Sequence, residues 1–441
     1  MKISVIGLGF VGFPLYISIL NISQRISSVV GLEEDSNNGR IKIKKILQTK
    51  KNYFNNKELD FLFNKNKKKI NISSDYKNAV ESDFIFICIP FHIDAKLKTN
   101  EKNYFLTIKK YYLAAKKNSI IILNSTLPPG YTSSLIAKFK KQNIFREDVG
   151  IVFSPERVEP GLNYLKSIVD SPRVFSSNSN DVISRKTKKL FSIIFNTRKF
   201  KLIEFKKYEE AELCKILENS YRASNIAFIE EWGVLAEKLE INIYSILNAI
   251  KQRETHSNIM KPGLGVGGYC LTKDPYFAKF SSINYLSKKI EFPFIDLSMK
   301  TNLRMHLRSI SMLRSILKKS KIKKILIIGI AYTNNVDDLR NSRGIDLLKF
   351  IKTRGVLTHI YDEAVKQKKI LGSIVINNLS KINNYDCIIF VNKNSAIKKI
   401  NFKKIKRDIT LLDLNNVLDE KEIDMLIDKT KNLTVLGRGD V

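Results

Sequence analysis

The sequence predicts an α/β protein with two doubly wound domains that are joined by a central helical region. Short apolar runs of strand length alternate with helical stretches in the first 200 residues and again after residue 320, which is typical of parallel sheets covered by helices. The stretch between them shows helical periodicity instead. A chain of 441 residues also favours two or three domains over a single core.

The first domain is predicted over residues 1–200. Lys2–Ile6 reads as a buried strand that is followed by a glycine turn and a helix, and Ser28–Leu32 reads as a second strand. Phe84–Ile89 and Ile120–Leu123 are further apolar strands. This order predicts a Rossmann-like domain with a parallel sheet.

The central region is predicted over residues 201–315. A long helix is expected from Tyr208 to about Lys238, with these apolar residues at helical spacing: Leu213, Ile216, Leu217, Ile226, Ile229 and Leu235. A glycine-rich loop follows at Pro262–Gly268, and another helix is expected over about Asp296–Lys319. The long apolar stripe predicts a homodimer or higher homo-oligomer.

A second Rossmann-like domain is predicted over residues 316–441. It begins with the strand Lys324–Ile328, which Gly329 follows. Its later strands are expected at Thr358–Tyr361, Cys387–Val391 and Thr410–Leu412.

The composition excludes several classes of protein. The formal net charge is +33, but lysines are spread along the chain and the densest run is only Lys65–Lys69, so no nucleic-acid partner is predicted. Ile3–Leu20 is apolar, yet its glycines and Pro14 argue against a signal peptide or a membrane span. Four cysteines without a C-x-x-C spacing predict neither a disulfide framework nor a metal site. A cytoplasmic protein without a membrane partner is expected.

A phosphate-binding turn is predicted directly after the first strand, where Gly7, Gly9 and Gly12 form G-x-G-x-x-G around Phe10 and Val11. These glycines let the backbone approach a pyrophosphate at the start of a helix. Glu33 follows the second strand, 21 residues after Gly12, and a carboxylate there favours NAD over NADP. Glu34 or Asp35 takes this role if the strand ends later, and a plain strand–turn–helix connection is the alternative.

Cys270 is the candidate nucleophile among the cysteines. It ends the glycine loop Gly263–Tyr269 and is followed by Lys273 and Asp274. A thiol becomes nucleophilic where cations or hydrogen-bond donors stabilise its thiolate. A small residue at the end of a flexible loop is the alternative interpretation. The other cysteines are expected to pack in strands or in the helix core: Cys88, Cys214 and Cys387.

Lys215 and Asn219 lie four residues apart and therefore share one helix face, with Glu212 and Arg222 near it. A lysine and an asparagine side by side are suited to donate hydrogen bonds to an oxyanion. A solvated charged stripe is the other interpretation of the same pattern, and the spacing alone leaves both open.

Taken together, these motifs resemble the UDP-glucose/GDP-mannose dehydrogenase superfamily over nearly the whole chain. The segments that carry the resemblance are Gly7–Gly12, Ser125–Gly130, Ser154–Val158, Ala211–Lys215 with Asn219, Gly265–Asp274 and Asp338–Ser342. Glu156–Val158, Tyr221-Arg222 and Asn225–Ala227 look most similar to the bacterial UDP-N-acetylhexosamine branch, which comprises 6-dehydrogenases of UDP-GlcNAc and UDP-ManNAc.

The resemblance implies a role for each matching residue. Cys270 is the nucleophile, and Lys215 and Asn219 stabilise the oxyanion. Water and proton transfer fall to Thr126, Glu156 and Asp274. The nucleotide sugar is held by Arg157, Val158, Lys215, Asn219, Arg222, His256, Gly263 and Tyr332. Arg340 reaches the cofactor. No metal is implied.

The implied reaction oxidises the C6 alcohol of a nucleotide sugar to a carboxylate with two NAD, through a thiohemiacetal and a thioester on Cys270. The expected substrate is a UDP-N-acetylhexosamine destined for surface polysaccharide, with UDP-glucose or GDP-mannose as alternatives.

Departures from the pattern of this superfamily bear on the substrate. The chain has Tyr332-Thr333 where the superfamily carries a lysine, and Asn415 lies where a cation is usual. His256 lies in Glu254–His256, where the amino-sugar branch has His-Pro-Arg, and Tyr269 replaces a histidine. The substrate therefore stays open, whereas the segments for hydride transfer are intact.

Two rival classes share the cofactor domain. A 3-hydroxyacid or 6-phosphogluconate type dehydrogenase needs no thiol, so Cys270 and the second α/β domain argue against it. A non-catalytic NAD-binding relative is expected to have lost Cys270 or Lys215, and both are present.

Overall fold

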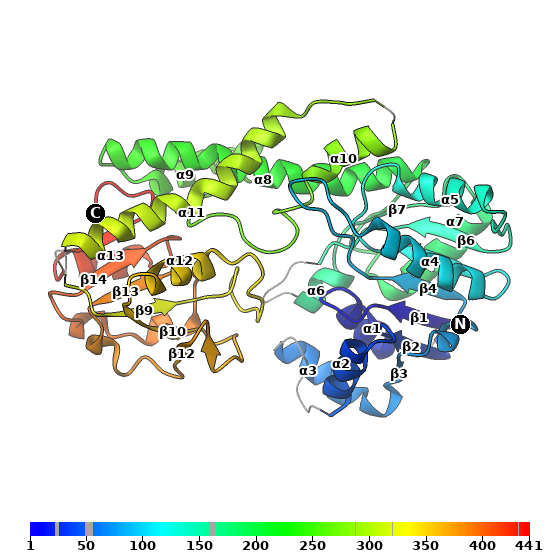
Figure 1. Ribbon diagram of the computed structural model, residues 1–441, viewed down its shortest axis with the longest axis horizontal. Coiled ribbons are helices and arrows are strands. Elements are labelled where there is room, and N and C mark those ends of the chain that lie inside the picture. Colours follow the sequence, from blue (N-terminus) through cyan, green and yellow to red (C-terminus); the bar gives the residue numbers. More distant parts are fainter. Residues whose placement is uncertain (23–25, 49–55, 159–163, 287, 320, 431) are drawn as a thin grey trace. The chain divides into compact units, whose positions relative to one another are not determined.

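The structure is a computed structural model that describes residues 1–22, 26–48, 56–158, 164–286, 288–319, 321–430 and 432–441 (Figure 1). The chain forms two compact units: Met1–Glu218 with Lys273–Glu291, and Asn219–Thr272 with Phe292–Val441. The central helical segments are divided between these units. The three-part division at residues 200 and 315 stays a prediction.

The first unit contains an eight-stranded sheet with the order β3-β2-β1-β4-β5-β6-β7-β8. The strands are β1 (Lys2–Ile6), β2 (Ser28–Leu32), β3 (Ile72–Ser73), β4 (Phe84–Ile87), β5 (Ile120–Leu123), β6 (Gly150–Phe153), β7 (Arg173–Ser176) and β8 (Leu202–Phe205). Neighbouring strands run parallel except β6 and β7, which pair antiparallel. The predicted doubly wound parallel sheet is confirmed, with this one reversal near its edge.

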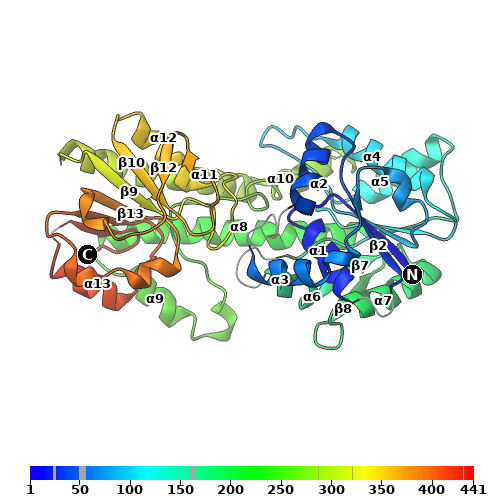
Figure 2. The ribbon, with the colours of Figure 1, turned by 90° about the horizontal axis from the view of Figure 1, so that it is seen from below.

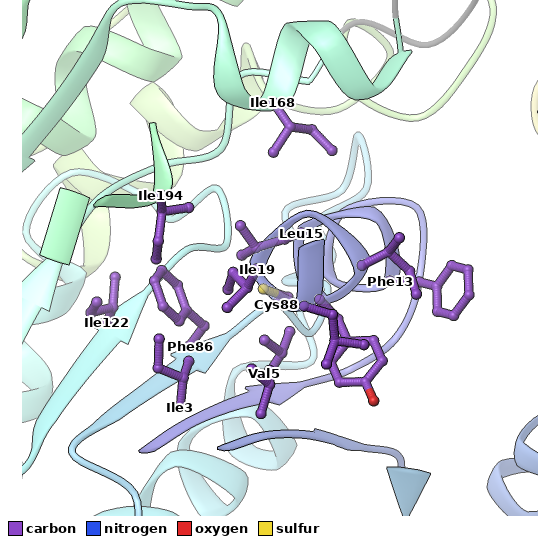
Figure 3. Packing of buried hydrophobic residues seen from close by; sticks show 14 of the residues in the cluster. Ile3, Val5, Phe13, Leu15, Ile19, Phe86, Cys88, Ile122, Ile168 and Ile194 are labelled. Atoms are coloured by element: carbon purple, nitrogen blue, oxygen red, sulfur yellow. The ribbon is translucent and has the colours of Figure 1, made fainter. Parts of the chain in front are cut away.

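Helices cover both faces of this sheet. They are α1 (Gly12–Asn21), α2 (Asn37–Gln48), α3 (Lys57–Lys65), α4 (Glu101–Ala114), α5 (Tyr131–Lys141), α6 (Tyr164–Val169), α7 (Asp181–Ile194) and α10 (Tyr276–Asn284). One core lies under α1, α3, α6 and α7, and the other lies under α4, α5 and α10. Figure 3 shows Cys88 in the first of these cores, among Val5, Leu15 and Ile19. Burial on both faces explains why the central strands are continuously apolar.

The second unit contains a seven-stranded sheet with the order β11-β12-β10-β9-β13-β14-β15 (Figure 2). The strands are β9 (Lys324–Ile328), β10 (Leu357–Tyr361), β11 (Lys369–Ile370), β12 (Ser373–Val375), β13 (Cys387–Phe390), β14 (Thr410–Asp413) and β15 (Leu433–Val435). Only β11 pairs antiparallel within this described sheet. The helices are α9 (Ile243–Ile250), α11 (Pro293–Lys319), α12 (Arg343–Lys352) and α13 (Glu420–Ile427). Helices α11 and α12 cover one face and α13 covers the other.

Helix α8 (Tyr208–Lys238) begins in the first unit and ends in the second, and its bounds are those that the sequence predicts. Its apolar residues lie on two faces. Ile216 and Ile229 are buried, whereas Leu213, Leu217 and Leu235 are exposed. In the second unit α11 packs beside α8, where Asn302 Nδ2 donates to the Ala223 carbonyl at 2.8 Å.

The predicted strands and helices are mostly confirmed at their stated bounds. β4 ends at Ile87, two residues before the predicted end, and α11 begins three residues before Asp296. The apolar stretch Ile3–Leu20 contains most of β1, the glycine turn and most of α1. Among the helices of the described ranges, none is both long and apolar enough to cross a lipid bilayer.

Candidate active site

The turn after β1 has a backbone that only glycine adopts easily. Gly7 has φ +85°, and a Cβ added to Gly12 would lie 2.0 Å from the Gly7 carbonyl oxygen. A Cβ added to Gly9 would meet no atom within 4 Å, so a ligand can approach its backbone. This turn therefore has the form that the sequence predicts for a pyrophosphate site.

The start of α1 suits an anion. Helix α1 is described over its whole length. The side chain of its N-cap residue, Val11, does not cap the helix with a hydrogen bond, and the first turn carries no acidic residue. The N–H groups of the first turn therefore meet no competing carboxylate from the helix itself. The residues present fit a dinucleotide: the glycine turn and the start of α1 would hold its pyrophosphate.

Glu33 directly follows β2 and lies at the glycine turn. Its Oε1 accepts hydrogen bonds from the Leu8 backbone N–H at 2.6 Å and from Lys42 Nζ at 2.5 Å. Since β2 ends at Leu32, neither Glu34 nor Asp35 takes the position after the strand. Asp35 instead pairs with Arg40 at 2.7 Å on the surface. Hydrogen bonding of Glu33 to a ribose stays a prediction.

Thr126 and Glu156 follow neighbouring strands of the first unit. Thr126 is half-buried in the loop after β5, and Glu156 follows β6. The buried Asn124 connects these two loops. Its side-chain Nδ2 donates to the Ser154 backbone carbonyl at 2.6 Å, and its own backbone carbonyl accepts the Glu156 N–H at 3.2 Å. Both segments thus lie at the carboxyl end of the sheet, where ligands of doubly wound folds bind.

Glu156 is suited to exchange a proton near neutral pH. Burial raises the pKa of its carboxyl group to about 7. The positive charges of Arg173, Lys215 and Arg157 oppose this rise. A carboxyl group with this pKa is a candidate general base. Arg157 itself pairs with Glu218 at 2.7 Å, and the Val158 N–H donates to Glu156 Oε1.

Lys215 and Asn219 do not belong to a solvated stripe. Asn219 is buried, Lys215 is half-buried, and Glu212, one turn before Lys215, is fully buried. Glu212 accepts hydrogen bonds from Gly130 N at 2.6 Å, from Thr132 N at 2.9 Å and from Thr132 Oγ1 at 2.5 Å. The structure therefore weakens the solvated-stripe interpretation and leaves the oxyanion role as a prediction.

Asp274 lies just before α10 in the first unit and is fully buried. It forms an ion pair with the buried Lys273, whose Nζ lies 4.5 Å from the centroid of the Phe277 ring. A buried, paired carboxylate is held in one geometry, because loss of its partner would leave an uncompensated charge.

Cys270 is exposed at the end of the glycine loop in the second unit. Two glycines before it pack against the segment that follows β9. A Cβ added to Gly268, which has φ +78°, would lie 2.6 Å from the Tyr332 ring, and one added to Gly267 would lie 2.9 Å from the Asn341 carbonyl. Close packing without side chains therefore fixes the backbone that leads to the thiol.

Cationic and aromatic side chains surround this end of the loop. The Arg340 guanidinium lies 5.1 Å from the centroid of the Tyr269 ring and forms a bidentate pair with Asp338. Burial raises the pKa of the Tyr332 hydroxyl, the charges of Asp338 and Cys270 add to this rise, and those of Arg340 and Arg222 oppose it. Tyr332 thus lies near the thiol, and Arg340 and Arg222 lie near Tyr332, all within one unit.

Asn415 fastens the glycine loop at its start. Its Oδ1 accepts the Leu264 N–H at 2.7 Å, and its Nδ2 donates to the Val391 carbonyl at 2.5 Å. A Cβ added to Gly263 would lie 2.3 Å from Asn415 Oδ1. The sequence marked Asn415 only as a missing cation; its role in holding the loop depends on contacts with residues far away in the chain.

His256 lies in a segment that contacts α8 beside Arg222, because Asn258 Nδ2 donates to the Tyr221 hydroxyl at 3.1 Å. It is exposed in the short helical turn Glu254–His256, and its Nδ1 lies 2.8 Å from the hydroxyl of Thr255. Its predicted contact with the substrate stays a prediction.

The cysteines divide by exposure, with one correction. Cys88 and Cys387 are buried, and burial raises the pKa of both thiols. Cys214 was expected in the helix core, but it is half-buried, because α8 turns this part of its circumference towards the surface. All four cysteines lie in described segments, and none forms a disulfide.

The chain combines a glycine turn that fits a dinucleotide with an exposed thiol at the end of a second glycine loop. These two features are typical of an NAD-dependent dehydrogenase with a candidate cysteine nucleophile. Within that class, the chain belongs to the UDP-glucose/GDP-mannose dehydrogenase family. Its NAD binding domain matches residues 1–195, its central domain residues 209–303 and its UDP binding domain residues 326–420. The protein is therefore an oxidoreductase that uses NAD and acts on a UDP-sugar, which confirms the class and cofactor that the sequence predicts.

Several known proteins are similar along their whole length. The UDP-N-acetyl-D-mannosamine dehydrogenase of Methanocaldococcus jannaschii is 26% identical over 432 residues, 96% of this chain and 92% of that protein. The UDP-N-acetyl-D-glucosamine 6-dehydrogenase of Pseudomonas aeruginosa is 27% identical over 444 residues, with 96% and 99% covered. The structure of a UDP-D-ManNAc dehydrogenase from Pyrococcus horikoshii has a TM-score of 0.82 at 26% identity, with both chains fully covered.

Proposed function

We propose that the protein is a UDP-N-acetylhexosamine 6-dehydrogenase, which oxidises the C6 alcohol to a carboxylate in two steps and binds the carbon to Cys270 after the first of them. The observation that carries this proposal is the exposed thiol at the end of the glycine loop, near Tyr332, which itself lies near Arg222 and Arg340. A dehydrogenase that stops at an aldehyde or ketone needs no such thiol. The names of the similar proteins, UDP-N-acetyl-D-mannosamine and UDP-N-acetyl-D-glucosamine dehydrogenases, support the amino sugar.

The first half of the reaction makes the aldehyde and traps it. When bound, NAD supplies the acceptor for the hydride in both oxidations. The alcohol loses its proton to a base and its C6 hydride to the cofactor. The Cys270 thiolate then adds to the aldehyde carbon, and the oxygen takes a proton, which gives a thiohemiacetal. Lys215 and Asn219 donate hydrogen bonds to the oxygen while it carries negative charge.

The second half forms and hydrolyses a thioester. With a second NAD bound, the thiohemiacetal would lose its hydroxyl proton to a base and its remaining C6 hydride to that NAD, which leaves the thioester. Water then attacks the thioester carbon, the carbon–sulfur bond breaks, and the carboxylate leaves with the thiolate restored. Glu156 accepts the proton of the attacking water, since its pKa of about 7 leaves it partly ionised at neutral pH. Thr126 and Asp274 orient the water and complete the proton transfer.

Substrate and cofactor contacts follow the same proposal. The glycine turn with Phe10, Val11 and Glu33 binds NAD, and Arg340 is a further cofactor contact in this proposal. The UDP-sugar is bound by Arg157, Val158, Lys215, Asn219, Arg222, His256, Gly263 and Tyr332. Thr333 and Asn415 stand at positions where the superfamily usually has cationic residues. A substrate whose sugar differs from those of the similar proteins would fit this change.

A homodimer is proposed through the exposed apolar face of α8. Phe228 and Trp232 lie one turn apart on it with ring centroids at 6.1 Å, and they are 54% and 49% exposed. Leu235 and Leu239 continue the same apolar surface. Exposed aromatic residues in such a cluster are typical of interfaces. A reducing compartment such as the cytoplasm is also proposed, because the chemistry requires Cys270 as a thiol.

The experiment that tests the substrate is a panel of UDP- and GDP-sugars, with NAD present and NADH absorbance as the signal. The proposal predicts turnover with UDP-N-acetylmannosamine or UDP-N-acetylglucosamine that exceeds turnover with UDP-glucose and GDP-mannose. Higher kcat/KM with UDP-glucose would replace the amino sugar, and no NADH with any sugar would contradict the enzymatic proposal.

A further inference from the structure

Glu212 is a buried carboxylate that connects two segments of the first unit. Glu212 is fully buried, and its carboxylate accepts three hydrogen bonds at the start of α5. The donors are the backbone N–H groups of Gly130 and Thr132 and the Thr132 hydroxyl. Gly130, the N-cap of α5, has φ +93° and contributes no side chain to cap the helix. Glu212 thus satisfies N–H groups that would otherwise lack a partner, and a carboxylate is favoured there by the helix dipole.

Each of the connected segments carries a residue of the proposed chemistry. Gly130 ends the loop that begins after β5, and Thr126 lies four residues before it. Lys215 lies three residues after Glu212, on the adjacent turn of α8. The Glu212 side chain therefore helps to hold the backbone of Lys215 in place relative to the loop of Thr126.

The other end of that loop is also fixed. Ser125 Oγ donates to the Ile89 carbonyl at 2.6 Å, and the Asn124 amide links the loop to the Glu156 segment. Without Glu212, the loop would keep its anchor at β5 but lose the three hydrogen bonds that tie the start of α5 to the turn of α8 before Lys215, and among the described residues only the Ser133–Glu209 hydrogen bond would join these two segments by side chains. The consequence would fall on the geometry between Lys215 and Thr126.

We propose that Glu212 is a positioning residue for the oxidation: it acts through Lys215 and Thr126 and does not itself touch the reacting atoms. This inference rests on the proposed function, because it assigns Glu212 to the same site. A displacement of about 1 Å of catalytic groups is enough to lower a rate by about 10²-fold. The expected defect is therefore in kcat, with substrate affinity nearly kept.

The test compares Glu212→Gln with Glu209→Gln in the full-length protein. The amide introduced by Glu212→Gln would keep an acceptor for Thr132 but would present an N–H group towards the Gly130 N–H. Glu209 lies one turn earlier on α8 and accepts from Ser133 Oγ at 2.5 Å, so it provides the same change on the same helix at a half-buried site. Steady-state kinetics would use NAD and the sugar of highest turnover, and Tm would report folding.

We expect kcat to fall about 10- to 100-fold in Glu212→Gln, with KM for both substrates within about threefold. Glu209→Gln should keep kcat within about twofold. A folded Glu212→Gln variant with wild-type kcat, or an equal fall in Glu209→Gln, would overturn the proposal. The pH profile of kcat/KM gives a further test. If its pH-dependent limb is lost only in Glu212→Gln, Glu212 is itself the catalytic acid or base, and the positioning role is overturned.

Thr132→Val supplies a second variant that keeps the side-chain shape and removes one hydroxyl donor. We expect a smaller fall in kcat, about three- to tenfold, and no further fall when it is combined with Glu212→Gln, since both changes break one network. Additive effects would overturn the proposal. If Glu212→Gln does not fold, unchanged kcat in Thr132→Val would overturn it. Failure of the proposed function is distinct, because the wild-type protein would then oxidise no sugar.

Discussion

At the scale of single residues, Cys270 differs from the other cysteines in exposure and surroundings. The buried Cys88 and Cys387 have raised pKa values, whereas Cys270 is exposed beside Tyr332, whose hydroxyl interacts with the positive charges of Arg340 and Arg222. Access and nearby positive charge are the conditions that make a thiol nucleophilic.

Replacement of Cys270 by serine should therefore abolish the oxidation to the acid. A hydroxyl of similar size hardly ionises near neutral pH, so turnover is expected to fall by about 10³-fold or more. NAD binding, measured by fluorescence titration, should persist because the glycine turn is unchanged. Near-normal acid formation by Cys270→Ser would contradict the thioester mechanism.

Thiol modification gives the matching control on the unaltered chain. A thiol-directed reagent should inactivate the wild type, and the sugar substrate should slow inactivation. Because Cys214 is half-buried, some labelling there is expected, and mass spectrometry must assign the modified site. Inactivation should follow Cys270 and not Cys214.

The pH dependence of the reaction should report Glu156. A general base works when ionised, and the ionised fraction of a group with a pKa of about 7 grows as pH rises through that value. Because Glu156 acts in the hydrolysis that ends the reaction, kcat is expected to rise about tenfold per pH unit below about pH 7 and to level off above it. Arg173→Met should move this limb to higher pH, because it removes a positive charge that favours the carboxylate. A limb that is unchanged in Glu156→Gln would assign it to another group.

At the scale of elements, the glycine loop depends on close packing with Asn415. A Cβ at position 263 would overlap Asn415 Oδ1, so Gly263→Ala should displace the loop or break the hydrogen bond to Leu264. Such overpacking costs about 1–3 kcal/mol. We expect a fall of about tenfold or more in kcat/KM for the sugar.

The double variant Gly263→Ala/Asn415→Gly separates overlap from other effects of alanine. It removes the overlapping oxygen but also the hydrogen bond, so it should recover part of the lost stability, measured by Tm, and little of the kcat/KM. A single Gly263→Ala variant with wild-type kcat/KM and Tm would show that the loop tolerates a side chain there.

The elements show what the sequence could and could not predict. β1, β2, β5 and α8 have the predicted bounds, because continuous apolar runs and helical periodicity are local signals. Seven strands of the described chain were not predicted: β3, β6, β7, β8, β11, β12 and β15. They have two to four residues each, so they carry little periodicity, and their pairing depends on neighbours far away in the chain.

In the candidate site, too, local motifs could be predicted from the sequence and long-range contacts could not. Glycines, Cys270 and Glu33 follow recognisable local patterns. The partners of Glu212 lie 80 or more residues away, and Asn415 contacts a loop 151 residues before it. No local pattern marks such contacts, so the roles of these two residues emerged only from the folded chain.

At the scale of the whole molecule, assembly should depend on the exposed face of α8. Burying Phe228 and Trp232 against a second copy would remove a large apolar area from water, and a charge placed there would be desolvated without a partner. Phe228→Glu with Trp232→Glu should therefore yield a monomer by sedimentation at micromolar concentration. Phe61→Glu, on the exposed surface of α3, is the matched control and should leave the dimer intact.

A wild-type protein that is already monomeric at that concentration would contradict the dimer. A dimer that survives both glutamates would place the interface elsewhere. Either outcome leaves the assignment to the family unchanged, because that assignment depends on the three matched domains.

The central claim is that one protein carries out both oxidations, and that Cys270 holds the carbon from the aldehyde stage until the acid is released. The direct measurement is the ratio of NADH formed to sugar consumed, with the UDP-sugar limiting, NAD in excess and the product identified by mass spectrometry. The account predicts two NADH for each UDP-sugar, a product that carries a C6 carboxylate, and no aldehyde captured by hydroxylamine in solution. One NADH for each sugar, with the aldehyde released and trapped, would contradict it.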